Sequence, residues 1–361
     1  MRIGLVIYGG LDIISGGYLY DRKLVEYLRR QGDQVEVISL QWRNYASHLS
    51  DNLSPGLIHR LAELDVDILL QDELNHPSLF WVNRRLSQQQ KRRGIPFVAI
   101  IHHLRASELH PAWQLALYRR IERTYLLTLD GFIYNSQTTR QAVVQLTGHD
   151  LPGVVAFPAG DHFQPQIDSA EITSRAFKPG PLRLIFVGNL IPRKGLDFLL
   201  AALSRIPRGT ATLTVAGNLS SDPAYVRRLR RQAATNRLQG SVNIIGALPT
   251  AELAAQFAAH HVLAVPSTYE GFGIVYLEGM GFGLPAIATN RGAASEIITH
   301  GKNGYLVPPG DVDALSAVLL MLAQQRETLA EIGQAARQRY LLHPTWEQTG
   351  AIIHSYLKGL R

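Results

Sequence analysis

Two carboxylates and two adjacent cations carry the strongest chemical signal in this sequence. Glu270 lies in a glycine-flanked segment, Glu278 follows eight positions later, and Arg193 and Lys194 are neighbours upstream. An ionised carboxylate can accept hydrogen bonds from two neighbouring hydroxyl groups, such as those of sugars and ribose. The guanidinium fork of arginine and the compact charge of lysine both bind phosphate oxygens. Each side chain alone could be a solvated surface group, but their combination favours a site for a phosphorylated ligand that carries hydroxyl groups.

The segment around Glu270 has the order strand, glycine loop and helix. An apolar run at 262–265 predicts a buried strand, and a helical pattern begins after the glycines. In a parallel α/β sheet, such loops form ligand sites at the carboxyl ends of the strands. Glycines allow the backbone to approach a ligand closely, and the first N–H groups of a helix attract anions. We therefore expect ligand contacts from Gly271, Phe272, Gly273 and Ile274.

Arg193 and Lys194 follow a second predicted strand, at 184–187, which ends at Gly188. The segment is not a Walker A loop, because Lys194 is followed by glycine rather than by Ser or Thr. It nevertheless places two cations just after a strand and before a helical pattern. Gly217 ends a further predicted strand, and we expect that strand end to flank the base of a bound nucleotide.

The sequence from Glu270 to Glu278, Glu-Gly-Phe-Gly-Ile-Val-Tyr-Leu-Glu, resembles the E-x7-E motif of glycosyltransferase family 4. Members of this family are retaining enzymes of the GT-B fold. The resemblance extends over most of the chain and is strongest between 184 and 311. It implies that Arg193 and Lys194 bind the pyrophosphate of a nucleotide-sugar donor. In that reading, Glu270 accepts hydrogen bonds from the sugar hydroxyls and Glu278 holds the ribose.

The beginning of the chain predicts a second ligand edge. A strand at 2–8, a helix from about 18 to 30 and a strand at 35–38 form a βαβ unit. Gly16 and Gly17, just before that helix, could cradle a phosphate or a sugar, or could simply form a tight turn. The resemblance to family 4 implies that these glycines approach the phosphate of the donor.

Two histidines follow another predicted strand, at 97–101. His102 and His103 are expected at its carboxyl end, where ligands bind in this architecture. A histidine in such a place is often structural. The resemblance implies that one of the two contacts the donor sugar. His102 matches that position best, but His103 stands where the family often has Asp, so both remain candidates.

The length of 361 residues predicts two domains, because single hydrophobic cores rarely exceed about 300 residues. The resemblance implies an α/β GT-B architecture with two Rossmann-like, doubly wound parallel-sheet domains that face each other across a cleft. We expect an acceptor-side domain at 1–165 and a nucleotide-sugar-binding domain at 166–340, which opens with a polar linker at 166–182. The segment 341–361 is expected to carry a helix that crosses back to the first domain.

Composition excludes several classes of protein. The chain has no cysteine, which excludes disulfides, thiol catalysis and cysteine–zinc sites. Neither a signal peptide nor an apolar run of about 20 residues is found, which predicts a cytoplasmic protein. The net charge is +7, with +1 in residues 1–165 and +6 in 166–361. This distribution suits a nucleotide diphosphate ligand and argues against nucleic acid, which would require a continuous basic stripe with stacking aromatics.

We expect no metal and no cofactor at the site. Asp65 and Asp67 form an Asp-x-Asp pair, which in other glycosyltransferases can hold a divalent ion. Here the pair leads directly into an apolar strand and is typical of a strand-entry turn. Arg193 and Lys194 would then do the work that a metal ion does elsewhere.

We accordingly predict a retaining, metal-independent hexosyltransferase that uses a UDP- or GDP-linked sugar. The acceptor would be a hydroxyl of a sugar, a glycan or a lipid-linked molecule. A non-catalytic nucleotide-sugar-binding protein is one alternative. An NAD-dependent Rossmann oxidoreductase is another, and it would rest on Gly279, Gly281 and Gly283, whose spacing departs from the dinucleotide fingerprint. The catalytic candidates are Glu270, His102, Arg193 and Lys194.

A stretch rich in cations suggests contact with an anionic membrane surface. The chain has no acidic residue between Glu73 and Glu108, and the apolar run 79–82 precedes the cations on what reads as one helix. This pattern is typical of an interfacial helix. The alternative interpretation is that the cations follow the preference of a helix C-terminus for positive charge and that the apolar residues belong to the core. The cations are Arg84, Arg85, Lys91, Arg92, Arg93 and Arg105.

Overall fold

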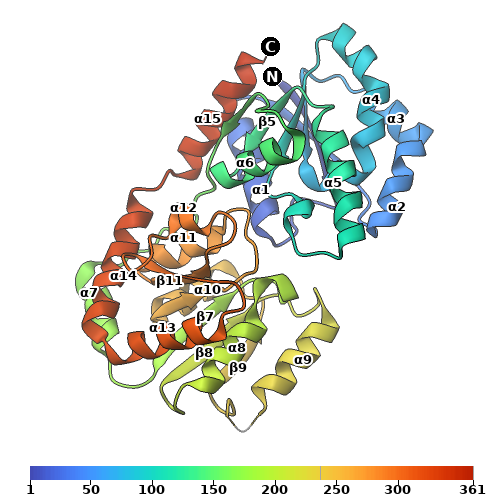
Figure 1. The fold of residues 1–361 in the computed structure, drawn as a ribbon. Helices are drawn as coiled ribbons and strands as arrows, with labels where there is room; N and C mark the ends of the chain where they lie inside the picture. The colour runs from blue at the N-terminus through green and yellow to red at the C-terminus, as the bar shows by residue number, and fades with distance from the viewer. Residues whose placement is uncertain (236, 361) are drawn as a thin grey trace. The chain divides into compact units, whose positions relative to one another are not determined.

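The computed structural model describes residues 1–235 and 237–360, with the side chains of 88–93 outside the description. The chain forms two compact units, each a parallel sheet with helices packed against it (Figure 1). The first unit comprises Met1–Pro158 together with the chain from Trp346 onward, and the second comprises Ala159–Thr345.

The first unit is built on a six-stranded sheet in the order β2-β1-β3-β4-β5-β6. All of its strand pairs are parallel. The strands are β1 (Arg2–Tyr8), β2 (Gln34–Leu40), β3 (Ile68–Asp72), β4 (Phe97–Ile101), β5 (Gly131–Tyr134) and β6 (Gly153–Val155). The helices are α1 (Gly16–Arg30), α2 (Tyr45–Ser50), η1 (Asp51–Leu53), α3 (Pro55–Ala62), η2 (Glu73–Asn75), α4 (His76–Arg93), η3 (Arg105–Ser107), α5 (Ala112–Leu126), α6 (Gln137–Thr147) and α15 (Trp346–Gly359).

Both faces of this sheet are buried, as its apolar strands require. Successive residues of a strand point to opposite faces, so each strand contributes to two core clusters. One cluster contains Val6 and Phe97, and the other contains Leu5 and Val98. Because parallel strands are covered on both sides, their sequences are continuous apolar runs rather than alternating ones.

The C-terminal helix α15 belongs to the first unit, where it packs on α1 and β6. Close contact depends on Gly350, because a Cβ at that position would lie 2.3 Å from the ring of Tyr27. Thr349 donates a hydrogen bond of 2.6 Å to the carbonyl of Phe157. The predicted return of the C-terminal helix to the first domain is therefore confirmed.

The second unit contains another six-stranded parallel sheet, in the order β12-β11-β10-β7-β8-β9. Its strands are β7 (Leu182–Val187), β8 (Ala211–Ala216), β9 (Val242–Gly246), β10 (Val262–Ala264), β11 (Ala286–Thr289) and β12 (Gly304–Val307). Its helices are α7 (Ser169–Phe177), η4 (Pro192–Lys194), α8 (Leu196–Arg205), α9 (Pro223–Ala233), α10 (Thr250–Ala259), α11 (Ile274–Gly281), α12 (Ala294–Ile297), α13 (Val312–Gln324) and α14 (Arg326–Leu341).

The predicted fold class, two Rossmann-like parallel-sheet units with a returning C-terminal helix, is confirmed. One local expectation differs from the structure. The segment 166–182, expected as a linker, contains α7, which packs against α14. A capping box formed by Asp168 and Glu171 starts this helix, and buried Ile172 and Ala176 anchor it. The chain passes between the units at 158–159 and again at 345–346.

Candidate active site

Glu270 is the centre of a polar cluster in the second unit. Its side chain is buried in the loop that precedes α11. Lys194 Nζ lies 2.6 Å from Oε1 of Glu270, and Arg193 Nη1 lies 3.6 Å from Oε2. Ser267 Oγ donates a further hydrogen bond of 2.6 Å to Oε1. The structure thus brings together the carboxylate and both cations that the sequence singled out.

Burial and ion pairing act in opposite directions on this cluster. Burial alone would raise the pKa of Glu270, but the neighbouring charges of Lys194 and Arg193 and the hydrogen bonds outweigh it and bring the pKa to about 2. Burial lowers the pKa of Lys194 more than Glu270 raises it. Near neutral pH, Glu270 is therefore an ionised group that can act as a hydrogen-bond acceptor.

The loop of Arg193 and the loop before α11 are held together by their backbones. The amide of Thr268 donates to the carbonyl of Arg193 over 2.8 Å, and Arg193 Nη1 donates to the carbonyl of Tyr269 over 2.8 Å. Gly195 has φ +71°, and a Cβ there would lie 2.1 Å from the carbonyl oxygen of Pro266. Only glycine permits this approach, so the geometry of the cluster depends on Gly195.

Among the described residues, no side chain caps the N-terminal backbone amides of α11. Gly273 is the N-cap, with φ +94°, and it provides no side-chain acceptor. The first amides of a helix lack intrahelical partners and favour anions. Gly271 and Phe272 are buried beside this cap, and Ile274 is the first helical residue. The arrangement can accommodate a negatively charged group next to Lys194.

Glu278 lies on α11 and is half-buried. Its Oε1 is 3.3 Å from Nε2 of His162. The histidine comes from the loop after Ala159, where Gly160 packs against the backbone of α11 and a Cβ would lie 3.1 Å from Leu277. The role of Glu278 as a ribose ligand stays a prediction.

Gly188 and Gly217 allow two strand ends to come close together. A Cβ at Gly217 would lie 1.8 Å from the carbonyl oxygen of Gly188. The amide of Gly217 donates to the carbonyl of Gly246 over 2.8 Å. Both glycines therefore shape the carboxyl edge of the second sheet, whatever they contact in a bound ligand.

In the first unit, Gly16 and Gly17 lie in the first turn of α1 rather than in the loop before it. Ser15 is the N-cap, and its side chain accepts from the amide of Tyr18. A Cβ at Gly17 would lie 3.2 Å from the ring of His102. Gly17 thus makes room for the histidine, and phosphate contact by either glycine stays a prediction.

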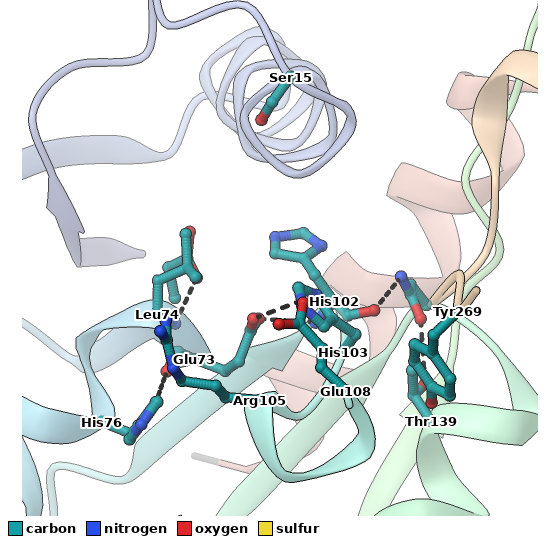
Figure 2. A network of polar contacts seen from close by, with 12 residues as sticks. Ser15, Glu73, Leu74, His76, His102, His103, Arg105, Glu108, Thr139 and Tyr269 are labelled. Atoms are coloured by element: carbon teal, nitrogen blue, oxygen red, sulfur yellow. Dashed lines mark hydrogen bonds and ion pairs between the residues drawn. The ribbon is translucent and has the colours of Figure 1, made fainter. Parts of the chain in front are cut away.

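His102 is buried at the end of β4 and is held on several sides. Its Nε2 lies 3.1 Å from Oδ1 of Asp21, and its backbone amide donates to Oε2 of Glu73 over 2.7 Å. Its carbonyl accepts from Nδ2 of Asn135 over 2.7 Å. Figure 2 shows the contact between the carboxylate of Glu73, which lies on η2 directly after β3, and the main chain of His102.

His103 is more exposed and points to the loop that follows it. Its Nε2 lies 2.9 Å from Oε1 of Glu108, as Figure 2 shows, and its Nδ1 lies 4.0 Å from Oε1 of Glu73. The two histidines therefore have different partners: His102 binds Asp21 of α1, and His103 binds Glu108 of the loop that follows it and lies near Glu73 of η2. Which of them contacts the donor stays a prediction.

The structure gives ordinary structural roles to the residues behind two alternative predictions, a metal-binding aspartate pair and a dinucleotide-binding glycine motif. Asp65 and Asp67 both pair with Arg2 at the amino end of the sheet. Gly279 and Gly281 lie inside α11, where Cβ atoms would lie 2.9 Å from Leu263 and 3.0 Å from Tyr340. These two glycines therefore support helix packing rather than a dinucleotide-binding turn.

Sequence reasoning missed the acidic partners of His102. Asp21 stands on the stripe of α1 that also carries buried Leu24, Val25 and Leu28, where an apolar residue is expected. Asp72 and Glu73 are consecutive carboxylates at the end of an apolar strand, and both are buried. The sequence signal that indicates these residues is a charged side chain at a position where the apolar periodicity predicts a core residue.

The chain is similar to known glycosyltransferases. Residues 169–339 match the family described as Glycosyl transferases group 1. Glycogen synthase of Mycobacterium tuberculosis is 29% identical over 312 residues, which cover 84% of this chain and 72% of that protein. A GDP-mannose-dependent alpha-(1-6)-phosphatidylinositol monomannoside mannosyltransferase of the same organism is 30% identical over 210 residues, 55% of this chain and 53% of that protein.

Solved structures with the same fold cover nearly the whole chain. Sucrose-phosphate synthase from Thermosynechococcus elongatus superposes with a TM-score of 0.83 at 21% identity, covering 99% of this chain and 98% of that one. Anabaena HepE in complex with UDP and glucose gives a TM-score of 0.79 at 20% identity, covering 99% of this chain and 100% of that one. The chain has the GT-B fold. Together with the family match over the second unit, this makes it a glycosyltransferase, and the enzyme class predicted from the sequence is confirmed.

Proposed function

We propose that this glycosyltransferase moves a hexosyl group from a nucleotide-diphosphate sugar to an acceptor hydroxyl, with retention at the anomeric carbon and without a metal ion. The observation that carries the proposal is the cluster of buried Glu270 with half-buried Lys194 and Arg193 at the glycine-capped start of α11. It combines an ionised hydroxyl acceptor with two cations and backbone amides. Placement in glycosyltransferase family 4 is part of the proposal.

The relatives support a nucleotide-sugar donor. HepE was solved with UDP and glucose, and the mycobacterial mannosyltransferase is described as GDP-mannose-dependent. A UDP- or GDP-linked sugar presents a diphosphate next to a sugar, which is the chemistry that the cluster can bind. UDP-linked and GDP-linked sugars are both candidate donors, since UDP and GDP-mannose both occur in the names of the relatives.

In the proposed reaction, the leaving diphosphate gains negative charge as its bond to the anomeric carbon breaks. Lys194, Arg193 and the first amides of α11 stabilise that charge, a kind of fixed electrostatic support that is often the largest catalytic contribution. Glu270 accepts hydrogen bonds from the sugar hydroxyls, and Glu278 from the ribose. The acceptor oxygen attacks the same face of the sugar, and its proton passes to the departing phosphate oxygen.

Donor turnover tests this proposal against a binding protein. A panel of UDP- and GDP-sugars is incubated with the protein, and release of the nucleoside diphosphate is measured. We expect slow release from at least one donor, with water as acceptor. A non-catalytic protein would instead raise its melting temperature with a nucleotide sugar and release nothing.

We further propose that the acceptor is presented at an anionic membrane surface. The structure corrects the surface expected from sequence, because Leu79 and Val82 are fully buried and Phe80 packs against the core. Trp81, Arg84 and Arg85 of α4 are exposed, while the side chains of Lys91, Arg92 and Arg93 lie outside the described residues. Among the described helices, none is long and apolar enough to cross a membrane.

The neighbouring helix α5 adds a stronger surface of the same kind. A hollow of about 650 Å³ beside it is lined by Arg119, Arg120 and Arg123 together with apolar groups. Trp113 and Leu117, on the same helix, are 69% and 40% exposed. Exposed apolar side chains beside clustered cations suit an anionic lipid surface, where each cation adds about 1 kcal/mol. A lipid-linked acceptor is in keeping with the phosphatidylinositol substrate in the name of the mycobacterial relative.

Co-sedimentation with vesicles tests this part of the proposal. We expect binding to vesicles that contain anionic phospholipid, weakened by salt, and lost when Arg119, Arg120 and Arg123 are changed to Gln. The control changes Arg227, Arg228 and Arg230, which are exposed on α9 of the second unit. Equal loss in both triple variants, or no binding to anionic vesicles, would contradict a surface on α5.

A further inference from the structure

A buried group of charged side chains surrounds His102 in the first unit. Asp21 and Asp72 are fully buried, and one carboxylate oxygen of each lies, with a ring nitrogen of His102, in a group whose atoms are all within 4.8 Å of one another. Asp21 comes from α1, and Asp72 ends β3. The cluster thus joins three elements at the carboxyl edge of the first sheet, where ligands bind in this architecture.

The geometry leaves the His102 ring little freedom to rotate. Nε2 is engaged by Asp21 at 3.1 Å, and Tyr20 packs edge-on against the ring at 5.3 Å between centroids. On a third side, the backbone at Gly17 is so close that even a methyl group there would press on the ring. Among the described hydrogen bonds, Nδ1 of His102 takes part in none.

The position of the proton on Nδ1 decides what this atom can do. Because Asp21 accepts from Nε2–H, a neutral ring would carry no hydrogen on Nδ1, which would then be an acceptor. Only the protonated ring offers Nδ1–H as a donor. A sugar hydroxyl or a phosphate oxygen would meet a positively charged N–H donor if the ring is protonated and a nitrogen lone pair if the ring is neutral.

The surrounding charges favour the protonated ring. Oδ2 of Asp21 and Oδ2 of Asp72 are buried without a hydrogen-bond partner. Burial, with the charge of Asp21, raises the pKa of Asp72 well above its usual value, so the buried negative charge that a protonated His102 offsets is that of Asp21. Burial lowers the pKa of His102, but Asp21 and the other carboxylates outweigh it and raise the pKa to about 10. The charged or titratable groups that face the ring are Tyr20 and Asp21 of α1, Asp72 of β3 and Glu73 of η2, with His103 next in the chain.

We propose that Asp21 is a positioning residue that keeps His102 protonated, so that His102 offers a fixed cationic N–H donor to the nucleotide-sugar substrate. The role toward substrate rests on the proposed function, whereas the protonation state of His102 is a property of the protein alone. Asp21 itself touches no substrate in this account. Its contribution acts through the charge and the orientation of the imidazole.

The protonation state is measured first, by two-dimensional nitrogen–proton NMR of the histidine rings. We expect both ring nitrogens of His102, assigned with the variant His102→Gln, to be protonated in the wild type from pH 6.5 to 9. In Asp21→Asn, which keeps the shape of the side chain, we expect the ring to titrate near the ordinary value of about 6.5. A wild-type His102 that is neutral at pH 7.5 would overturn the proposal.

Activity then tests what the charge does. For Asp21→Asn, we expect diphosphate release to be about 10²-fold slower than wild type at pH 8.5 and to recover as the pH falls below about 6.5. The wild type should show no such recovery. A variant that is slower by the same factor at every pH would show a structural role and contradict the proposal. If the protein releases no diphosphate, the same pH comparison is made on the affinity for the nucleotide sugar.

A matched control is available within the same unit. Asp33 forms another buried aspartate–histidine pair, with its Oδ2 3.0 Å from Nε2 of His354 of α15. Asp33 also binds the N-terminal amine and lies at the start of β2, at the opposite edge of the sheet. We expect Asp33→Asn to lower stability and to leave the pH dependence of turnover unchanged. A pH dependence equal to that of Asp21→Asn would refute a specific role for Asp21.

Discussion

At the scale of single residues, Glu270 and Lys194 form one unit whose halves depend on each other. Glu270 is buried and Lys194 is half-buried, and each charge is stabilised by the other at 2.6 Å. Removing one leaves its partner as an uncompensated buried charge, which is more costly than never having had the pair. The cluster is therefore expected to be sensitive to either substitution, in chemistry as well as in local stability.

We predict that Glu270→Ala and Lys194→Ala each reduce diphosphate release by about 10²- to 10³-fold, the usual effect of removing one electrostatic donor or acceptor at a reacting group. The measurement is turnover of the preferred donor by variants whose fold is checked by circular dichroism. Asp313→Ala serves as a control, because it removes only an exposed partner of Arg205. Folded variants with near-normal turnover would refute the assignment.

A second prediction at this scale concerns His261, which is neutral in the folded protein. Its Nδ1 accepts from the amide of Arg183 at 2.9 Å, and its Nε2 lies 3.0 Å from the carbonyl of Arg175. Burial, with the nearby arginines, lowers its pKa to about 3. The folded state therefore binds fewer protons than the unfolded state between about pH 3 and 6.5, and the stability that His261 contributes is present above about 6.5 and lost as the pH falls towards 3.

We accordingly expect the difference in unfolding free energy between the wild type and His261→Gln to be largest near pH 7 and to shrink as the pH falls from 6.5 to 4. Urea unfolding at a series of pH values measures it. A difference that stays constant over this range would show that His261 does not remain neutral in the fold.

The sequence predicted the residues of the second-unit cluster because their spacing follows local elements. Arg193 and Lys194 lie in the loop after a strand that ends at a glycine, and Glu270 lies in the loop before a helix. The apolar periodicity and the glycine turns in the sequence therefore locate them. The partners of His102 could not be found in this way. Asp21, Asp72 and His102 meet only through the order of strands β1, β3 and β4, which local patterns do not specify.

At the scale of elements, the glycine turns decide how closely the two loops of the cluster approach each other. Gly195 and Gly209 both have positive φ, +71° and +80°. A Cβ at Gly195 would collide with the carbonyl of Pro266, whereas nothing lies within 4 Å of a Cβ at Gly209. Alanine substitutions at these two glycines therefore distinguish the energetic cost of the left-handed backbone conformation from the cost of the steric clash at Gly195.

We predict that Gly209→Ala costs about 1–2 kcal/mol of stability, the price of the left-handed conformation alone, with no effect on turnover. Gly195→Ala should cost more, and it should also reduce turnover because it separates the loops of Lys194 and Glu270. Denaturant unfolding and donor turnover of both variants provide the comparison. Equal effects of the two substitutions would mean that the close approach at Gly195 does not matter.

Element boundaries were predicted less well than element types. Gly16 and Gly17 looked like the end of a loop because glycine is rare in helices, yet Ser15 caps α1 and the helix starts directly after it. Segment 166–182 looked like a linker because it is polar and flanked by prolines. Its capping box and the packing of α7 on α14 outweigh that composition.

At the scale of the whole molecule, each of the two units contains one parallel sheet, and each sheet has a carboxyl edge of the kind where ligands bind in this architecture. Length and the repeated order of strand, glycine and helix predicted this organisation, since each parallel strand needs a helical crossover. The return of α15 to the first unit came from the resemblance to a family. No local pattern in residues 346–359 specifies which surface that helix covers.

We predict that turnover persists in EDTA. In the proposed mechanism, Arg193 and Lys194 supply the positive charge that a metal ion supplies in other glycosyltransferases. Asp65 and Asp67 both form ion pairs with Arg2. Diphosphate release is compared before and after dialysis against the chelator. Complete loss of turnover that Mn²⁺ restores would contradict the proposed mechanism.

The central claim is retaining transfer from a nucleotide sugar by the Glu270 cluster, and one NMR measurement tests it most directly. The protein is incubated with α-linked UDP- and GDP-sugars, and the anomeric proton of the sugar released to water is followed before mutarotation. The account predicts that the α-anomer appears first with the wild type and that Glu270→Ala releases almost none. First release of the β-anomer, or undiminished release by the variant, would contradict it.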